Sequence, residues 1–352
     1  MNDVNPGLKP WAESCNRFAV NPTHTGAKFF YAFQLRRASV MARQLGKGFR
    51  LRRLLAIVQS SDEGFVGHVV GHVGVLGLLC LLASGVTLAT EQRPTLGPKP
   101  LDIHVQANGF GRASPADITT LLESAAFQIW QHCPRTQLDG IDVYYRADHP
   151  QTDFQRTSSG RIGIGLSAHD THWAQYGFQF AHEFCHALAN YSNNPQRVVR
   201  YPRHANMWLE ESLCETASLF ALRAMSRSWQ TAPPYPAWRG YAPWLNDYVE
   251  QRLALPEHRL PAGTPFSVWF RKNESALRQN SDMRERNTII AIQLLPIFEA
   301  EPRGWETVVF LNRASSNAEE SLAQHFVDWR SQCPKHLRPF VTRLATVFAV
   351  KL

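Results

Sequence analysis

The chain has 352 residues, of which 44% are hydrophobic, so it holds enough apolar material for one large domain or two ordinary ones. Its formal net charge is +8, but residues 1–65 carry +6 of this, with ten Lys and Arg residues against four acids. The rest of the chain has 27 basic and 25 acidic residues, and this near-neutral balance argues against a surface that binds nucleic acid.

An apolar segment without any Asp, Glu, Lys or Arg spans residues 66–89. It is typical of a signal peptide, with cleavage after Gly85 or Ala89, or of a single membrane anchor, since roughly 20 residues cross a bilayer. A buried core helix is the third alternative, and four glycines in the segment's first half disfavour it. We therefore expect the rest of the chain to be secreted, periplasmic or membrane-anchored outside the cytoplasm. Residues 1–65 are interpreted as a basic extension that is disordered or precedes an internal start codon.

A small mixed sheet with one helix is expected after the proline-rich linker 90–100. Alternating apolar residues predict strands, and Ser114 followed by Pro115 predicts the start of a helix. The expected elements are a strand at 101–107, a helix from 115 to about 133, and strands at 140–147 and 160–168.

The next stretch, "QFAHEFCHALA" (179–189), contains two histidines four positions apart. On an α-helix, His182 and His186 lie one turn apart on the same face, so both imidazoles can bind one ion. Glu183, about 100° round the helix, can then act as a general base in metal-assisted hydrolysis. The alternative is a metal-free helix with two histidines packed in the core.

A second helix is predicted within residues 204–222, "HANMWLEESLCETASLFAL". Its Trp208, Glu211 and Glu215 match the pattern W-x-x-E-x-x-x-D/E that follows HExxH in one group of zinc enzymes. In this respect the chain resembles the gluzincin zinc peptidases. The match is specific only across residues 182–215.

The resemblance implies a role for each matching residue. His182, His186 and Glu211 would be the zinc ligands, and Glu183 the catalytic base. Glu215 would accept the free N–H of a ligand histidine and fix its tautomer. Three protein ligands leave one position open, as hydrolytic zinc requires.

The sequence departs from the family pattern at Glu210 and Ser212, and we expect neither residue to touch the ligand set. His204 is an alternative third ligand to Glu211. The resemblance also implies that the strand at 160–168 forms the sheet edge above the cleft, where Gly163 and Gly165 would leave room for a peptide backbone. These glycines could equally relieve a tight bend.

Four cysteines follow the apolar segment, an even number that suits an oxidising compartment. Cys185 could pair with Cys214 and Cys133 with Cys333, or the thiols could be free and buried. The residue that steadies the reaction's oxyanion is left open among several polar side chains: Tyr191, Tyr201, Arg203, His204 and Tyr241.

The chain from Trp208 onward is mainly helical in pattern, with a break at 231–240 and later helices that open at Thr264-Pro265 and Pro302. We therefore expect an α+β, zincin-like fold with a catalytic core at 101–230 and a helical subdomain at 231–352. The predicted function is zinc-dependent hydrolysis of peptide bonds in a peptide or protein substrate. The alternative is a catalytically inactive zincin-fold binding module of the cell envelope. The oligomeric state is left open, and residues 66–89 could associate with a membrane.

Overall fold

The computed structural model describes residues 100–192, 205–314 and 319–352, which all belong to one compact unit. The predictions for residues 1–65, 66–89 and most of the linker 90–100 lie outside the described residues. Among the helices that are described, none is long and apolar enough to cross a membrane.

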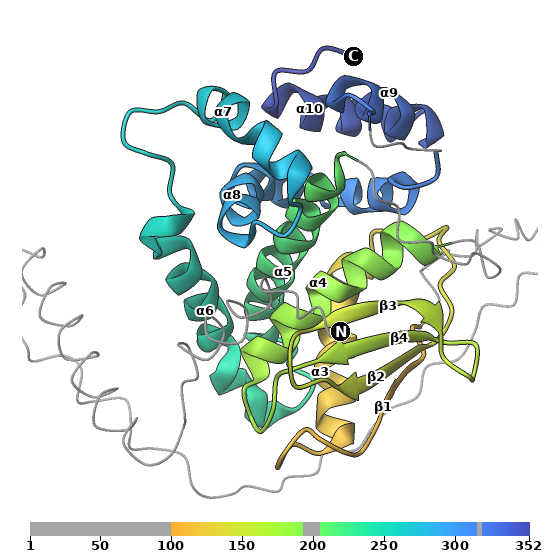
Figure 1. Ribbon diagram of the computed structural model, residues 1–352. Helices are drawn as coiled ribbons and strands as arrows, with labels where there is room; N and C mark the ends of the chain where they lie inside the picture. The colour runs from red at the N-terminus through yellow and green to blue at the C-terminus, as the bar shows by residue number, and fades with distance from the viewer. Residues whose placement is uncertain (1–99, 193–204, 315–318) are drawn as a thin grey trace, which may run out of the picture. The chain divides into compact units, whose positions relative to one another are not determined.

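A four-stranded mixed sheet opens the described chain (Figure 1). Its spatial order is β1-β2-β4-β3, with β1, β2 and β4 parallel and β3 antiparallel to β4. The three strands predicted from alternation are confirmed, and one further strand was missed because its sequence is polar. The strands are β1 (Ile103–Val105), β2 (Ile141–Tyr145), β3 (Gln151–Arg156) and β4 (Ile162–Leu166).

The expectation that the strand at 160–168 forms the sheet edge is wrong. β4 lies inside the sheet between β2 and β3, and β3 is the antiparallel edge strand. The side chain of Asp153 in β3 covers Gly163, where an added Cβ would meet its Oδ2 at 2.1 Å. Gly165 is likewise covered, by Arg146 and Tyr144. Both glycines make room for neighbouring side chains of the sheet.

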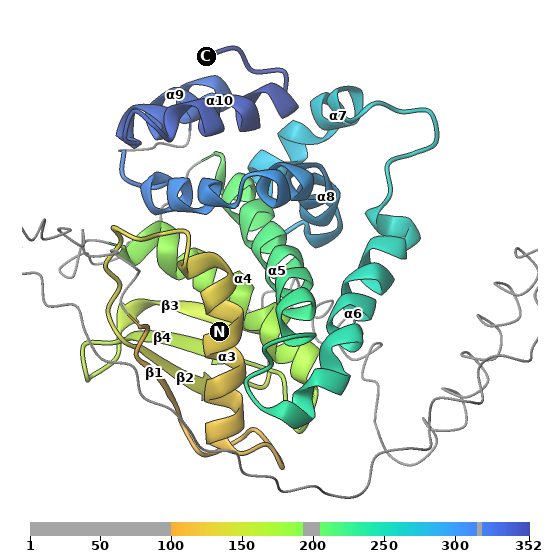
Figure 2. The ribbon, with the colours of Figure 1, turned by 180° about the vertical axis from the view of Figure 1, so that it is seen from behind.

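One face of the sheet is covered by two helices, α3 (Pro115–Trp130) and α4 (Trp173–Tyr191) (Figures 1 and 2). α3 begins as predicted, because the Ser114 hydroxyl accepts a hydrogen bond from the backbone N–H of Asp117 at 3.1 Å and a proline occupies its first turn. Its apolar residues contact β1 and belong to the same hydrophobic core as Ile141, Ile162 and Ile164 of the other strands. The opposite face of the sheet carries polar side chains.

The motif helix α4 lies against a second long helix, α5 (Met207–Trp229), in both views of the ribbon (Figures 1 and 2). Fifteen of the nineteen residues of α4 are buried, so the helix is enclosed on nearly all sides. Gly177 helps the two helices approach, since a Cβ there would already touch Leu222 of α5 at 3.0 Å. This contact fixes how the two predicted ligand segments face each other.

The chain after α5 is helical, so the α+β class with a mainly helical C-terminal half is confirmed. α8 packs on α5, and η3 packs on α4. The predicted break at 231–240 contains a 3₁₀-helix, and Pro302 opens another 3₁₀-helix. In chain order these elements are η1 (Pro236–Tyr241), α6 (Ala242–Ala254), η2 (Pro256–His258), α7 (Phe266–Gln279), α8 (Arg284–Ala300), η3 (Pro302–Phe310), α9 (Leu322–Gln332) and α10 (Arg338–Val347).

Candidate metal centre

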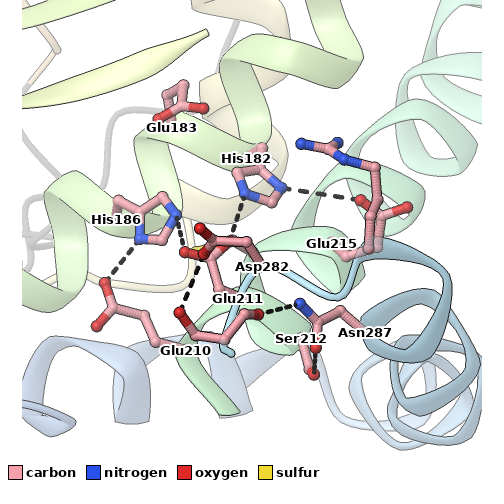
Figure 3. A network of polar contacts seen from close by, with 12 residues as sticks. His182, Glu183, His186, Glu210, Glu211, Ser212, Glu215, Asp282 and Asn287 are labelled. Atoms are coloured by element: carbon pink, nitrogen blue, oxygen red, sulfur yellow. Dashed lines mark hydrogen bonds and ion pairs between the residues drawn. The ribbon is translucent and has the colours of Figure 1, made fainter. Parts of the chain in front are cut away.

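Three of the predicted site residues converge between α4 and α5. Nε2 of His182 lies 3.3 Å from Oε2 of Glu211, and Nε2 of His186 lies 3.5 Å from Oε1 of the same carboxylate. The two imidazole centroids are 5.1 Å apart. These side chains keep between 13% and 23% of their surface exposed, so the cluster is reachable from solvent. Figure 3 shows both imidazoles from α4 turned toward Glu211 on α5.

The spacing of these atoms suits a zinc ion. Donors that lie ~2.0–2.1 Å from a tetrahedral zinc are about 3.3 Å from one another. The two nitrogen to oxygen distances, 3.3 and 3.5 Å, are close to this value, and each reaches a different oxygen of Glu211. The donor set of two imidazoles and one carboxylate is also one that zinc accepts in hydrolytic enzymes.

The Cys214 thiol also lies near the two histidines. One ligand atom from each of His182, His186 and Cys214 lies within 4.8 Å of the others. This thiol is fully buried, and burial raises its pKa well above the usual value, so it stays protonated in the metal-free protein. Because the Glu211 oxygens lie 3.3 and 3.5 Å from the imidazole nitrogens and this carboxylate is already charged, we take Glu211 as the third donor.

Glu210 touches the ligand set, contrary to the expectation from sequence. Its Oε1 lies 2.7 Å from Nδ1 of His186. A carboxylate only accepts, so Nδ1 carries the hydrogen that Glu210 accepts, and Nε2 is the nitrogen that faces Glu211. Figure 3 shows Glu210 and Glu211 meeting the two different nitrogens of this ring. The other departure, Ser212, does not contact the ligands, because its hydroxyl bonds to the Trp208 carbonyl and lies beside Asn287 of α8.

Glu215 lies beside His182, although more loosely than predicted. Its Oε2 is 3.8 Å from Nδ1 of His182, which is an ion-pair distance rather than a hydrogen bond. Its Oε1 accepts from Nη2 of Arg252 at 2.9 Å and from the hydroxyl of Thr288 at 3.0 Å. Glu215 therefore stands between His182 and the helices of the C-terminal half.

Glu183 is nearly buried, with 5% of its surface exposed, and faces the edge strand of the sheet. The Thr152 hydroxyl of β3 lies 3.1 Å from its Oε2 and 2.8 Å from its backbone carbonyl oxygen. This single proton can serve one acceptor at a time, and either contact fixes Glu183 against β3. Thr152 was missed from the sequence because it lies in an unpredicted strand, 30 positions before His182.

The site concentrates negative charge around two imidazoles. Burial by itself lowers the pKa of His186, but Glu211 and Glu210 outweigh it and raise this pKa well above the usual value. Burial raises the pKa of Glu211, while the charge of His186 reverses this and lowers it. Glu210 behaves in the same way, through its hydrogen bond with His186. The metal-free site therefore favours an extra proton on His186, and a divalent cation could replace that proton.

The remaining predicted residues take other positions. All four described cysteines, Cys133, Cys185, Cys214 and Cys333, are buried free thiols in the structure. Among the oxyanion candidates, the Tyr191 hydroxyl donates to the Asp153 carbonyl, and the Tyr241 hydroxyl accepts from the backbone of Ala174. Tyr201, Arg203 and His204 lie outside the described residues.

No protein-family model matches this sequence, and no curated protein or solved structure is significantly similar to it.

Proposed function

We propose that this chain is a zinc-dependent peptidase with a zincin-like fold of the gluzincin type. The observation that carries the proposal is that the Glu211 carboxylate reaches both imidazoles, with one oxygen 3.3 Å from His182 and the other 3.5 Å from His186, distances that suit the ligands of one zinc ion. An accidental HExxH sequence has no reason to meet a carboxylate from a second helix at these distances. The antiparallel strand β3 beside α4 is the last strand of the described sheet, and an extended peptide can pair with such an edge strand.

Each residue of the site has a separate task in this proposal. His182, His186 and Glu211 would hold the ion. Bound zinc would supply a Lewis acid that acidifies water and polarises the scissile carbonyl. The Glu183 carboxylate would take the proton of the attacking water and pass it to the leaving amine.

Glu183 must be released from Thr152, or share its hydroxyl proton, to meet the substrate. A carboxylate that accepts one hydrogen bond keeps lone pairs for a water molecule. In metal-free or substrate-free enzymes such catalytic contacts are often long and tighten only in the complex. The contact between Thr152 and Glu183 is therefore compatible with Glu183 acting as the base once substrate is bound.

The same contact supports a second candidate, a zincin-fold binding module that does not hydrolyse peptides. A Glu183 that stays buried against Thr152 would leave the site without a base. The two candidates differ only in turnover, since both keep the ligand set. Secretion, or anchoring through residues 66–89, remains part of either proposal.

The deciding experiment compares three purified proteins: the wild type, Glu183→Gln and Glu211→Gln. Zinc content is measured by atomic spectrometry, and hydrolysis with fluorescein-labelled casein, with and without a chelator. We expect the wild type to bind one zinc ion and to hydrolyse casein. Glu183→Gln should keep zinc but hydrolyse casein at least about 10²-fold more slowly, and Glu211→Gln should lose zinc.

Glu250→Gln, a change of an exposed acid on α6, is the matched control and should behave as the wild type. A wild type that binds zinc without chelator-sensitive turnover on casein or on a mixed peptide library would favour the binding module. A wild type without zinc would remove both candidates.

A further inference from the structure

Asn312, a residue from the C-terminal half, reaches into the candidate metal centre. It lies two residues after the end of η3 and 102 positions after Glu210, and it is 9% exposed. Its Nδ2 lies 2.6 Å from Oε2 of Glu210 and 3.0 Å from Oδ1 of Asn190. A carboxylate cannot donate, so the amide nitrogen of Asn312 must face Glu210, and its two hydrogens go to these two oxygens.

Asn190, in the last turn of α4, closes the arrangement. Its Nδ2 lies 2.7 Å from Oε1 of Glu210 and 3.0 Å from the backbone carbonyl oxygen of His186. Both of its amide hydrogens are thus used as well. Glu210 accepts from His186 and Asn190 through one oxygen and from Asn312 through the other. A buried polar network in which each donor has an acceptor holds its members in one arrangement.

The network determines which nitrogen of His186 faces the ion. With Glu210 fixed by two amides, Nδ1 of His186 keeps its hydrogen and its orientation, and Nε2 is left for the metal. If Asn312 were absent, Oε2 of Glu210 would lose the hydrogen bond that Asn312 donates, and the carboxylate would be free to turn. Groups that orient a metal-binding histidine in this way contribute to metal affinity although they do not touch the ion.

We propose that Asn312 is a positioning residue of the metal centre, which acts through Glu210 to hold His186 in its metal-binding tautomer and orientation. The inference rests on the metal site of the proposed function and not on peptide hydrolysis. It makes the C-terminal half a part of the centre, because the segment after η3 supplies a group that α4 and α5 lack.

The competing explanation is that Asn312 only anchors η3 to the motif helices. Asn287 provides the matched control for this. It is also a buried asparagine, 4% exposed, that ties the C-terminal half to α5. Its Oδ1 accepts from Ser212 at 3.4 Å and its Nδ2 donates to the Ser281 carbonyl at 2.7 Å, and neither partner is a predicted ligand. Loss of Asn287 should therefore weaken packing and leave zinc binding alone.

Two quantities are measured: zinc affinity, by competition with a chromophoric chelator, and the thermal midpoint of unfolding. The variants are Asn312→Leu, Asn287→Leu, Glu210→Gln and the double variant Glu210→Gln/Asn312→Leu. We expect Asn312→Leu to weaken zinc binding about 10- to 100-fold and Asn287→Leu to change it by less than about threefold. Because Asn312 acts through Glu210, the double variant should bind zinc about as weakly as Glu210→Gln alone.

The visible absorption of the Co²⁺-loaded protein gives a second measurement, since it reports ligand geometry and should change in Asn312→Leu but not in Asn287→Leu. If Asn312→Leu does not fold, Asn312→Asp replaces it, since this variant keeps the shape and opposes Glu210 with a second carboxylate. Equal zinc affinities of the two Leu variants, or independent additive losses in the double variant, would overturn the inference. Zinc binding with the expected pattern but without hydrolysis would leave the inference standing and remove only the peptidase.

Discussion

Arg252 of α6 and Glu215 of α5 form an ion pair in which both side chains are almost completely buried. The guanidinium Nη2 lies 2.9 Å from Oε1 of Glu215, and the two side chains are 1% and 2% exposed. Burial raises the pKa of Glu215, but Arg252, with Arg284 and His182, lowers it to about 2. The negative charge beside His182 is thus held by a residue outside the motif helices.

Replacing Arg252 by Leu should leave Glu215 as a buried charge without its directly paired cation. We expect the free energy of unfolding to fall by about 3–5 kcal/mol, because breaking a buried ion pair costs far more than the pair contributes. Chemical denaturation at neutral pH measures this. Arg223→Leu is the control: Arg223 pairs at 2.9 Å with Glu250, which is 52% exposed, and such pairs contribute at most about 1 kcal/mol. Equal losses in the two variants would contradict the assignment.

Thr152→Val should separate orientation of the base from zinc binding. Valine keeps the shape of threonine and removes the hydroxyl that contacts Glu183. We expect kcat to fall about 10-fold with little change in KM or zinc content, because the lost bond orients a catalytic group. Thr152→Ser keeps a hydroxyl and should recover most of the rate. A serine variant as slow as the valine variant would instead indicate that the edge strand itself had moved.

The zinc affinity of this site should change with pH over a wider range than the zinc affinity of an ordinary histidine site does. An unfolded histidine has a pKa of about 6.5, and Glu211 and Glu210 raise that of His186 in the metal-free protein. Proton binding therefore stabilises the metal-free fold fully below about pH 6.5 and ceases to do so as the pH rises through the raised pKa.

Zinc needs the neutral imidazole, so its affinity should continue to increase with pH above about 6.5. Chelator competition at several pH values between about 6 and 9 measures this. Glu210→Gln removes one of the two anions and should reach its plateau at lower pH. A wild-type affinity that is constant above about pH 7 would be inconsistent with the raised pKa.

Gly304 at η3 should not tolerate a methyl group. A Cβ there would lie 2.0 Å from Cζ of Phe340, whose ring is 1% exposed and packs edge to face against Phe298, which leaves it little room to move. Gly304→Ala should cost about 1–3 kcal/mol of stability through overpacking. Gly240, with nothing within 4 Å of an added Cβ, is the control and should change little. The thermal midpoints of the two variants check this.

Local sequence patterns predicted much of the fold. The Ser114 cap, the alternation in β1, β2 and β4, and the helical spacing of α4 and α5 depend on neighbouring residues, so a single sequence contains them. The edge strand β3 was missed because its residues Gln151–Arg156 lack an apolar alternation. β3 is a strand because it pairs with β4, and this tertiary contact is absent from the local pattern. Because β3 was missed, β4 was wrongly predicted to be the edge strand.

The candidate site was predictable where its geometry lies within one helix. The i,i+4 spacing placed His182 and His186 together, and the family pattern pointed to Glu211, which the structure brings beside them. The contacts of Glu210 were not predictable, because they depend on Asn312, 102 positions further on. The gluzincin assignment itself remains a prediction.

α5 carries three acids of the site. Glu210 contacts His186, Glu211 contacts both histidines, and Glu215 pairs with Arg252. Because one rigid helix holds all three, a slight rotation about its axis would disturb every one of these contacts at once. α8, which packs along α5, limits such a rotation. A side chain too large for that packing layer, unlike the similarly sized leucine of Asn287→Leu, would turn α5 and appear in solution as a change in metal affinity, although the altered residue touches none of the ligands.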